Sequence, residues 1–569
     1  MKRVFVGHRG VGKTSLLKRH ETYFPNVAHF DLDHEVEKIA KMSVSDYFKN
    51  NGEAAFRKLE IKTYEMLRAE NRAYVISLGA GFSPGLINQD DEVIFVTRST
   101  DADGRIFLNR PRLNPESSAL EESRKRYLER QAGFSDRANQ IYFMPEGIEK
   151  ENTIEKSVLT NWFQISGAYY TIAQSEIVNI ESIQEKYSQI ELRTDLIKLK
   201  TIEELTKAYP TFKWLVSVRD NHQINLNPAI QIDWDVNLKK LSIAPSIYSS
   251  HDDEITVGIE KLKSYKGHLK LCPVVENFVD LRLGYAWQQQ DSENRSFLPR
   301  SSSGKWIWYR KLAKYFQKIN FIRNFSFISD QPSAYEWLTL PSVKPKKWAA
   351  VLGKPVYFSR TLLQHENYFS AQQTFVTRID ISAEELIANI EWLQKLGLTF
   401  AAVTSPLKKT AYQLSADLST EAKQLKSVNT LMMQPNKISG HNTDLAGFQF
   451  LVKDLSIDQS QIAVWGGGGT LEMLKSVLPD ANYFSSQTGQ LRNMMTEAPN
   501  IKLLIWAAPR TTATLFPNEN LQIAQVIDLN YVENSMGLEY AAEKNIKYVS
   551  GLEMFKQQAL KQQEYWSTK

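Results

Sequence analysis

The pattern of apolar and polar positions predicts strands that alternate with helices. At the N-terminus the apolar run VFV is followed by the glycine-rich segment GHRGVGKTS and by LLKRHETYF, which predicts a strand, a loop and a helix. Further on, short apolar runs such as WLVSV, AIQID and HLKLCPVV recur with helical segments between them. A later stretch, QIAVWGGGGTLEMLKSVL, repeats the order strand, glycine turn, helix. The chain is therefore predicted to belong to the α/β class.

Polar, irregular stretches divide this pattern into three regions. MPEGIEKENT follows the first region and LPSVKPKKW follows the second. A chain of 569 residues is also too long for one core, since domains usually hold about 100–200 residues. We predict domains at residues 1–165, 166–343 and 344–569, the last with lobes at 344–455 and 456–545.

Composition and charge exclude several classes of protein. Hydrophobic residues make up 42% and charged residues 23%, which is typical of globular proteins. The net charge of +5 is small, and no run of like charges resembles a nucleic-acid-binding arm. The single cysteine, Cys272, cannot form an intramolecular disulfide. No apolar stretch approaches the ~20 residues that cross a bilayer, and the N-terminus lacks the apolar core of a signal peptide. We expect a cytoplasmic protein that binds small molecules and neither nucleic acid nor membranes, with its oligomeric state left open.

A phosphate-binding motif, G-x-x-x-x-G-K-[ST], lies between the first predicted strand and helix. In such a loop backbone N–H groups hold phosphates, the lysine reaches the β and γ oxygens, and the hydroxyl ligates Mg²⁺. The motif predicts ATP and Mg²⁺ as ligands. The residues assigned to the nucleotide are Gly7, Gly10, Gly12, Lys13, Thr14 and Ser15.

The segments after this motif resemble those of shikimate kinases. HFDLDHEVEK, GEAAFRKLE, ISLGAGF and RPRL occur in the order of that family. The resemblance implies phosphorylation of shikimate, with Lys13 and Asp33 as catalytic residues and with Thr14 and Asp31 at the metal. Ala80 replaces the middle glycine of the family's G-G-G turn, at a cost of roughly 1 kcal/mol if that residue needs a positive φ. The resemblance implies Asp33, Arg57, Gly79, Gly81 and Arg130 as shikimate-binding residues and Arg110 as the lid arginine on the nucleotide.

The middle region carries a lysine in an apolar run, Lys270 in HLKLCPVV. A buried amine is costly unless it is used, and a desolvated amine is a nucleophile toward a ketone. The alternative is a lysine at a strand end whose ammonium reaches water. Upstream, His251 follows another apolar run in IYSSHDD, and arginines occur in IELRTD and LVSVR.

These segments resemble, in order, type I 3-dehydroquinate dehydratase, a (β/α)8 barrel. The resemblance implies that Lys270 forms an imine with dehydroquinate and that His251 is the general acid/base. Gln223 stands where the family has a glutamate, which removes a charge that would orient the histidine. The region is also shorter than the 200 or so residues of a full barrel, so we expect a shortened one, with an inactive middle domain as the alternative. The implied substrate-binding residues are Glu191, Arg193, Arg219, Arg310 and Gln331.

The third region resembles shikimate dehydrogenase. AAVTSPLKKTA, KSVNTLM and GHNTDLAGF occur in the family's order before the glycine turn. The resemblance implies a two-lobed α/β domain with a Rossmann lobe, in which Lys408 and Asp444 relay a proton while hydride moves to or from a nicotinamide. Without the N-T-D segment, Lys408 would read as an exposed lysine beside Lys409. The implied substrate-binding residues are Ser359, Thr361, Asn429, Asn442 and Gln558, and the implied cofactor-binding residues are Gly466, Gly468, Gly469 and Ser486.

The dinucleotide predicted for this region is NADP. The family's arginine for the 2′-phosphate is replaced here by Ser485 and Ser486 in YFSSQTGQ. Hydroxyl groups can bond a phosphate but supply no charge, so NAD is kept as the alternative.

The order of the three regions resembles the last three domains of the fungal pentafunctional arom polypeptide. This implies a multifunctional shikimate-pathway enzyme of aromatic amino-acid biosynthesis, which converts 3-dehydroquinate through 3-dehydroshikimate and shikimate to shikimate 3-phosphate. Fungal quinate-pathway repressors resemble the same three domains, so a sensor is the alternative. Lys13, Lys270, Lys408 and Asp444 favour the enzyme, whereas Ala80, Gln223 and Ser486 favour the sensor.

Overall fold

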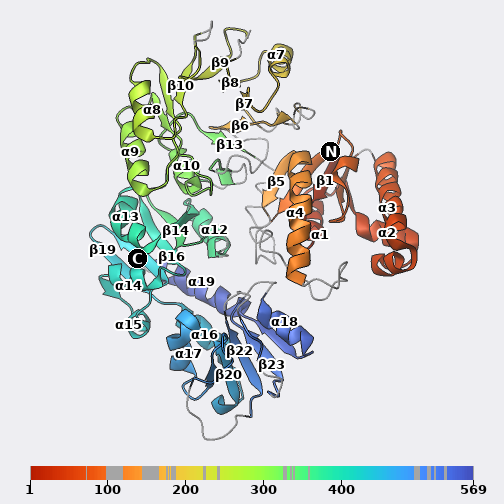
Figure 1. Ribbon diagram of the computed structural model, residues 1–569, viewed down its shortest axis with the longest axis vertical. Coiled ribbons are helices and arrows are strands. Elements are labelled where there is room, and N and C mark those ends of the chain that lie inside the picture. Colours follow the sequence, from red (N-terminus) through yellow and green to blue (C-terminus); the bar gives the residue numbers. More distant parts are fainter. Residues whose placement is uncertain are drawn as a thin grey trace. The chain divides into compact units, whose positions relative to one another are not determined.

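In the computed structural model the described residues form four sheets, two in each of two compact units. Figure 1 shows their helices and strands along the chain. The first unit is mainly residues 1–99 and 128–345, and the second is mainly 346–372 and 376–569. The domain boundaries given above remain predictions. The structure describes residues 2–71, 73–97, 119–143, 166–174, 177, 180, 183, 187–221, 226–239, 244–323, 330–332, 336–337, 340–356, 359 and 361–567, the last without 493–499, 509–513, 518–520 and 531–534.

The N-terminal region is a five-stranded parallel sheet in the order β2-β3-β1-β4-β5. β1 is central, and four of its five residues are buried because both faces of a parallel sheet are covered. The glycine loop therefore leaves the carboxyl end of the middle strand, where α/β sheets bind ligands. The elements are β1 (Lys2–Val6), α1 (Lys13–Tyr23), β2 (Ala28–Asp31), α2 (Leu32–Ala40), α3 (Val44–Glu70), β3 (Tyr74–Ser77), the 3-10 helix η1 (Pro84–Leu86), β4 (Glu92–Thr97), α4 (Ala119–Arg137) and β5 (Gln140–Phe143).

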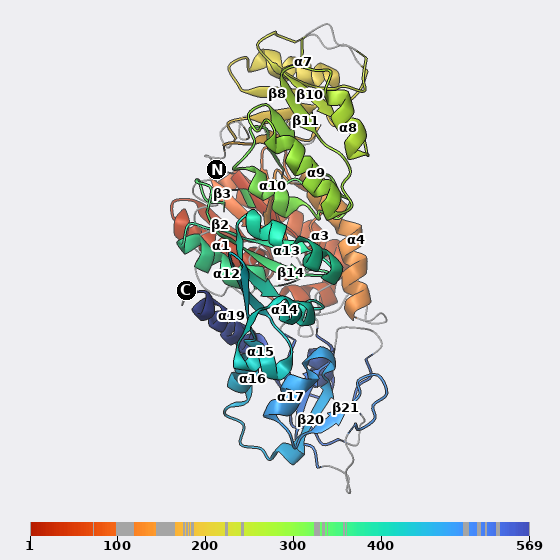
Figure 2. The same ribbon diagram turned by 90° about the vertical axis from the view of Figure 1, so that its left-hand side faces the viewer.

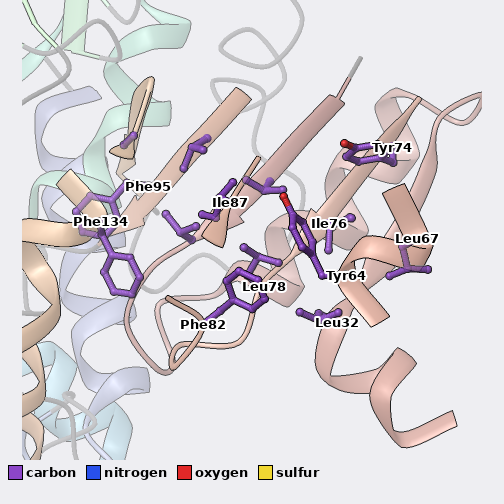
Figure 3. Packing of buried hydrophobic residues seen from close by; sticks show 14 of the residues in the cluster. Leu32, Tyr64, Leu67, Tyr74, Ile76, Leu78, Phe82, Ile87, Phe95 and Phe134 are labelled. Atoms are coloured by element: carbon purple, nitrogen blue, oxygen red, sulfur yellow. The ribbon is translucent and has the colours of Figure 1, made fainter. Parts of the chain in front are cut away.

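The core of this region packs large side chains from the sheet against α3 and α4 (Figure 3). Tyr64 of α3 meets Phe82 with ring centroids 5.1 Å apart. Phe134 of α4 meets Phe95 of β4 at 5.6 Å. These contacts fix both helices on the sheet that carries the glycine loop.

The middle region is an eight-stranded sheet in the order β12-β11-β10-β9-β8-β7-β6-β13. All seven ladders are parallel, and the last strand in sequence returns to the first. This is the strand order of a (β/α)8 barrel. The elements are β6 (Tyr169–Thr171), β7 (Ile190–Arg193), α7 (Leu199–Ala208), β8 (Trp214–Val218), β9 (Gln231–Asp235), β10 (Ile247–Ser250), α8 (Ile255–Leu262), β11 (His268–Leu271), α9 (Phe278–Gln289), β12 (Arg295–Phe297), α10 (Ile307–Ala313) and β13 (Phe321–Ile322).

Contacts across the interior show that this sheet curls round on itself. Tyr169 of β6 donates to Gln231 of β9 over 2.5 Å, and Lys270 Nζ of β11 lies 4.8 Å from the ring centroid of Phe321 in β13. Between β12 and β13 the described residues form no ladder, and Ile319 N–H donates instead to Ser296 Oγ at 3.3 Å. The expected shortened barrel is therefore present, with all eight strands.

The barrel is short because two of its crossovers are short. The connection from β8 to β9 is residues 219–230, and that from β9 to β10 is residues 236–246. A complete crossover with its helix takes at least about 10–12 residues, so both connections are close to that minimum length. The carboxyl end of β9 carries two aspartates, Asp233 and Asp235.

The C-terminal region has two lobes, as the sequence predicted. The first is a mixed sheet in the order β15-β14-β16-β18-β19-β17, in which β18 runs antiparallel to both neighbours. The capping box of Ser382 and Glu385 begins α13. The elements are β14 (Trp348–Gly353), α12 (Thr361–Ala371), β15 (Val376–Asp380), α13 (Ala383–Lys395), β16 (Leu398–Val403), α14 (Lys408–Leu414), β17 (Asp417–Leu418), α15 (Thr420–Leu425), β18 (Thr430–Gln434), β19 (Lys437–His441) and α16 (Asp444–Val452).

The second lobe is a five-stranded parallel sheet in the order β21-β20-β22-β23-β24. Figure 2 shows two of its strands, β20 and β21, with the helix α17. β24 ends at Ser550, beyond the predicted lobe limit at residue 545, and α19 then returns to the first lobe. Gln562 of α19 donates to the Asn429 carbonyl at 3.0 Å. The elements are the 3-10 helix η4 (Gln459–Gln461), β20 (Ile462–Gly466), the 3-10 helix η5 (Gly468–Thr470), α17 (Leu471–Val477), β21 (Asn482–Phe484), β22 (Leu503–Ala507), β23 (Gln525–Asp528), α18 (Met536–Glu543), β24 (Lys547–Ser550) and α19 (Leu552–Ser567).

No helix within the described residues is long and apolar enough to cross a membrane.

Candidate active sites

The glycine loop of the N-terminal region has the backbone of a phosphate cradle. Gly7, Gly10 and Gly12 have φ values of 148°, 77° and 99°. A Cβ on Gly7 would lie 2.2 Å from the Val96 carbonyl oxygen, so only glycine fits there. Lys13 Nζ donates to the Gly7 and His8 carbonyls at 2.8 and 3.0 Å, which holds the amine over the loop.

The predicted metal-binding pair is brought together at the start of α1. Thr14 Oγ1 donates to Asp31 Oδ2 at 2.6 Å, and Ser15 is exposed beside Thr14. One hydroxyl and one carboxylate with phosphate and water oxygens suit the hard, octahedral preference of Mg²⁺. The described residues contain no cluster of three or more His, Cys, Asp or Glu that could hold a metal by itself. A metal at this place would therefore depend on oxygens from the nucleotide.

The predicted shikimate-binding residues converge from four segments. Asp33 begins α2, Arg57 lies in α3, and Arg130 of α4 donates to the Ala80 carbonyl at 2.8 Å. Displacement of water around the carboxylate and the charge of Asp31 raise the pKa of Asp33. Two cations and one aspartate suit an acid that also carries hydroxyl groups. Arg110 lies outside the described residues.

Glycine is required at both positions of the predicted turn because a side chain would collide with neighbouring residues. Neither has a positive φ, but a Cβ on Gly79 would lie 2.8 Å from Asp33 Oδ1, and one on Gly81 would lie 2.1 Å from Arg57 Nη2. Ala80 also lacks a positive φ, so the strain considered from the sequence does not arise there. The alanine causes no backbone cost.

Glu60 is a residue of this site that was not assigned from the sequence. Arg57 Nη1 donates to Glu60 Oε2 at 2.7 Å, and the other carboxylate oxygen is buried without a hydrogen-bond partner. Burial raises the pKa of Glu60, although Arg57 opposes the shift. Its place in FRKLE, one helical turn after Arg57, was the available signal.

Lys270 of the barrel is fully enclosed and paired with a carboxylate that was not predicted from the sequence. Its Nζ donates to Asp233 Oδ2, which also accepts from Arg219 Nη2. Burial opposes ionisation of Asp233, but the charges of Arg219 and Lys270 together lower its pKa below the usual value. Asp233 and Lys270 lie on the inner faces of β9 and β11, so both side chains point into the barrel. The alternative of an exposed lysine is therefore wrong.

The other predicted barrel residues fall into two groups. Glu191 accepts from Thr171 of β6 and Ser217 of β8 at 2.5 and 2.6 Å, so it is held by the two neighbouring strands. Arg193 forms an ion pair at 2.7 Å with Asp195, two residues further along its own segment. Arg310 and Gln331 instead keep unsatisfied polar atoms. Arg310 Nε and Gln331 Oε1 are buried without a hydrogen-bond partner, while Gln331 Nε2 donates to Thr171 at 3.0 Å. A buried guanidinium with a free donor is suited to an anionic ligand.

His251 follows β10 at the carboxyl ends of the strands, where barrel sites are formed. Its Nδ1 lies 2.9 Å from Asp235 Oδ2. Cys272 follows β11 on its other side, and Arg300 links the two backbones by donating to the carbonyls of His251 at 2.9 Å and Cys272 at 2.6 Å. Burial opposes ionisation of the Cys272 thiol, but the charges of His251 and Lys270 lower its pKa to about 7. Gln223 lies outside the described residues.

The catalytic pair predicted for the third region is formed. Lys408, at the start of α14, donates to Asp444 Oδ2 at 2.5 Å. Asn429 Nδ2 donates to the other oxygen, Oδ1, at 2.9 Å, and Asn442 Oδ1 accepts the Asp444 backbone N–H at 3.0 Å. The lysine side chain keeps 29% exposure, so the ammonium remains accessible to a substrate.

The remaining residues predicted to bind the substrate of this region lie near the start of α12 and on α19. Ser359 donates to Thr361 at 3.0 Å near the start of α12. Gln558 of α19 lies beside α16, because a Cβ on Gly447 would be 3.4 Å from the Gln558 Cβ. The helix that begins with Asp444 is thus in contact with the helix that carries Gln558.

The glycine turn after β20 has the backbone expected of a dinucleotide site. Gly466, Gly467 and Gly468 have φ values of 94°, 105° and 38°, and Gly468 and Gly469 have open space where a Cβ would stand. These features leave room for a pyrophosphate against the backbone.

The position predicted for the 2′-phosphate is less open. Ser486 is buried, and its carbonyl accepts from Leu515 N–H at 2.7 Å. The Ser485 hydroxyl accepts from the N–H groups of Gln487 and Thr488 at 3.4 and 3.3 Å, so it caps the local turn. Neither serine supplies the charge that an arginine would bring.

Two parts of the chain match models of known protein families. Residues 9–155 match "Shikimate kinase", and residues 351–431 match "Shikimate dehydrogenase substrate binding domain". The chain therefore combines a kinase-like segment with a dehydrogenase-like segment, in the order expected. The middle barrel lies between the two matches.

Individual relatives also align with the third region. The shikimate dehydrogenase (NADP(+)) of Chlorobium phaeovibrioides is 36% identical over 124 residues, which is 21% of this chain and 43% of that protein. The corresponding protein of Pelagibacter ubique is 28% identical over 218 residues, 36% of this chain and 74% of that protein. For several further shikimate dehydrogenases the chain spans about half of their length.

Among solved structures, "Dehydroquinate dehydratase and shikimate dehydrogenase from S. pombe AroM" aligns with 72% of this chain and 97% of its own. The sequence identity is 16% and the TM-score is 0.31.

Proposed function

We propose that this chain is a trifunctional shikimate-pathway enzyme that converts 3-dehydroquinate to shikimate 3-phosphate. The observation that carries the proposal is that each of the three regions gathers, from separate elements, the residues that its own step requires. The matches to two shikimate-pathway families support the first and last regions. The barrel site around Lys270 supports the middle step.

The dehydration is assigned to the barrel. Lys270 Nζ adds to the ketone of 3-dehydroquinate and water is lost, which gives an iminium. His251 takes the proton from the adjacent carbon and the tertiary hydroxyl leaves with a proton as water, which forms the ring double bond. A second water hydrolyses the imine and releases 3-dehydroshikimate and the free amine. The net change is the loss of one water, and Arg310 is suited to hold the carboxylate.

The reduction is assigned to the third region. NADPH, when bound at the turn of Gly466, Gly468 and Gly469, supplies the hydride. Lys408 donates a proton to the ketone oxygen as it becomes a hydroxyl, and Asp444 holds the ammonium in place. Ser359 and Thr361 are suited to the carboxylate, while Asn429, Asn442 and Gln558 are suited to the hydroxyls.

The phosphorylation is assigned to the first region. The 3-hydroxyl of shikimate attacks the γ-phosphorus of ATP, ADP leaves, and Asp33 accepts the hydroxyl proton. The raised pKa of Asp33 supports this role, since a base is more effective when its pKa approaches the working pH. Lys13 neutralises charge on the transferred phosphoryl group. Mg²⁺, when held by Thr14 and Asp31 with phosphate oxygens, shields the phosphate charge.

The test is one coupled reaction. The purified chain receives 3-dehydroquinate, NADPH, ATP and Mg²⁺, and the four acids are followed by chromatography. We expect shikimate 3-phosphate to accumulate. Lys270→Ala should stop the sequence at dehydroquinate, Lys408→Ala at dehydroshikimate and Lys13→Ala at shikimate, each by at least about 100-fold. The exposed neighbours supply matched controls, Lys266→Ala and Lys409→Ala, which should leave the flux unchanged.

The other outcomes identify what fails. Reduction and phosphorylation of supplied dehydroshikimate, with dehydroquinate untouched, would mean that the barrel is an inactive scaffold. Absence of all three reactions would favour the sensor. The sensor is the weaker alternative, because a binding protein has no need for Lys13, Lys270 and Lys408 all held by specific partners.

A further inference from the structure

Three side chains at the carboxyl ends of consecutive barrel strands form a contiguous row. Asp235 ends β9, His251 follows β10 and Cys272 follows β11. The ladders fix this arrangement, because Ser249 pairs with Asp235 and the Cys272 N–H donates to the Ser250 carbonyl at 2.9 Å. The histidine is therefore flanked by a carboxylate on one side and a thiol on the other.

The carboxylate of Asp235 is held at both oxygens. Oδ2 lies 2.9 Å from His251 Nδ1, and Oδ1 accepts the Asn237 backbone N–H at 2.9 Å. Its side chain is only 12% exposed. Burial alone would raise the pKa of Asp235, but the hydrogen bond and charge of His251 and the Asn237 N–H together lower it. The carboxylate is thus ionised and cannot turn away from the ring without losing its second partner.

This contact decides which imidazole nitrogen is available for chemistry. An ionised carboxylate can only accept, so Nδ1 must carry the proton that it shares with Asp235. The lone pair of the neutral ring then lies on Nε2, which is the nitrogen left to take a proton from a substrate.

We infer that Asp235 is the positioning residue that orients His251 for proton transfer in the barrel. The inference rests on the proposed dehydration and deepens it. From the sequence, the change to Gln223 left the histidine without a charged partner. Asp235 supplies that charge from the next strand, so the barrel needs no glutamate at position 223 for a competent acid/base.

The test removes the negative charge of Asp235 and keeps the shape of its side chain. Asp235→Asn retains the volume but offers an amide that can donate to Nδ1, which favours the wrong tautomer. We expect kcat for dehydration to fall by about 100-fold or more with KM nearly unchanged. Asp235→Glu, which restores the charge, should recover a large part of kcat. Asp252→Asn is the matched control, because that carboxylate lies one residue after His251 but pairs with Lys261 and Ser250.

A second readout separates positioning from damage to the barrel. Borohydride reduces an imine to a stable amine, so incubation with dehydroquinate should still label Lys270 in Asp235→Asn, as detected by mass spectrometry. Because proton abstraction is then slow, the label should be mainly the substrate adduct, which is heavier by one water than the product adduct. A merely structural role would reduce labelling together with turnover.

The two hypotheses fail in different ways. If the unaltered chain neither turns over dehydroquinate nor becomes labelled, the proposed dehydration is wrong. If the unaltered chain is active and Asp235→Asn matches it in kcat, the inference about Asp235 is wrong while the dehydration stands. Equal loss in Asp252→Asn and Asp235→Asn would also overturn the inference.

Discussion

In the kinase-like pocket, Gly79 leaves space for two carboxylates that a larger residue would displace. A methyl group at position 79 would lie 2.8 Å from both Asp33 Oδ1 and Glu60 Oε1. Gly79→Ala should therefore displace the Asp33 carboxylate, to which we assign shikimate binding, and such overpacking costs about 1–3 kcal/mol. We expect KM for shikimate to rise roughly 5-fold to 100-fold, with KM for ATP unchanged, in steady-state kinetics of the kinase step. Gly85→Ala is the control, because the nearest atom to a Cβ at that position, Ser83 Oγ, would be 3.9 Å away.

Substitution of Asp233 is predicted to lower the stability of the barrel. It is fully buried and bonded to both Lys270 and Arg219. Asp233→Asn leaves two buried cations without a counter-charge, which typically costs about 3–5 kcal/mol. Urea unfolding of the full chain should show an earlier barrel transition. Asp253→Asn, whose side chain is 85% exposed, should leave that transition in place. An unchanged transition in Asp233→Asn would mean that the cations are solvated.

The sequence could indicate residues that lie within contiguous motifs, and it missed those that act through neighbouring strands. Lys408 and Asp444 stand in separate motifs whose resemblance to shikimate dehydrogenase predicted the pair, and in the structure the two side chains lie 2.5 Å apart. Asp233 and Asp235 belong to no such motif. The signal in QIDWD was only two carboxylates two positions apart at a strand end, which places both on one face. Which lysine or histidine that face meets depends on strand pairing, and one sequence does not specify it.

At the scale of elements, a relay of hydrogen bonds ties β1, α1 and β2 together. Arg3 Nη1 donates to His20 Nε2 at 2.9 Å, so His20 Nδ1 carries the proton that it donates to His29 Nε2 at 2.8 Å. His29 Nδ1 then donates to the Val27 carbonyl at 2.7 Å. Each bond in this order requires both imidazoles to be neutral. Burial, together with the charge of Arg3, lowers the pKa of both histidines.

This relay predicts a pH-dependent stability. Below about pH 6.5 the histidines bind protons in the unfolded chain but stay neutral in the folded chain. The free energy of unfolding is therefore highest above that pH and falls as the pH decreases. The slope from His20 is about 1.4 kcal/mol per pH unit over this range, and His29 adds to it in the same direction. Thermal unfolding of the full chain between pH 7.5 and pH 5 should show the transition of the kinase-like region moving down. His20→Gln should flatten that dependence, and an equally steep dependence in the variant would contradict it.

The barrel shows what sequence patterns convey about elements and what they do not. The apolar runs located its strands, and its unusual length was visible from the sequence. The reason for the length was not, because a short connection leaves no motif. In the structure the two short connections lie on either side of β9, at residues 219–230 and 236–246, and the described residues of the barrel still form eight strands. The return of α19 to the first lobe of the C-terminal region was equally unreadable, since its contacts with Asn429 are far apart in sequence.

At the scale of the whole molecule, each candidate site is built from residues of its own region. The described kinase residues lie between 7 and 130, the barrel residues between 191 and 331, and the dehydrogenase residues between 359 and 558. The bonds that the described residues make to Lys13, at its own glycine loop, to Lys270 and to Lys408 each come from the same region as the lysine. The three steps should therefore be separable by point substitution, without loss of the other two activities.

Separable sites predict complementation between defective chains. Lys13→Ala, Lys270→Ala and Lys408→Ala are each blocked at one step, and mixing all three should restore shikimate 3-phosphate formation from dehydroquinate. Intermediates then pass between chains through solution, so the mixture should show a lag that shortens as total protein rises. The measurement is the time course at several protein concentrations, with each single variant as a blocked control. A mixture that stays blocked, although every variant retains its two other activities with supplied intermediates, would mean that the steps depend on transfer within one chain.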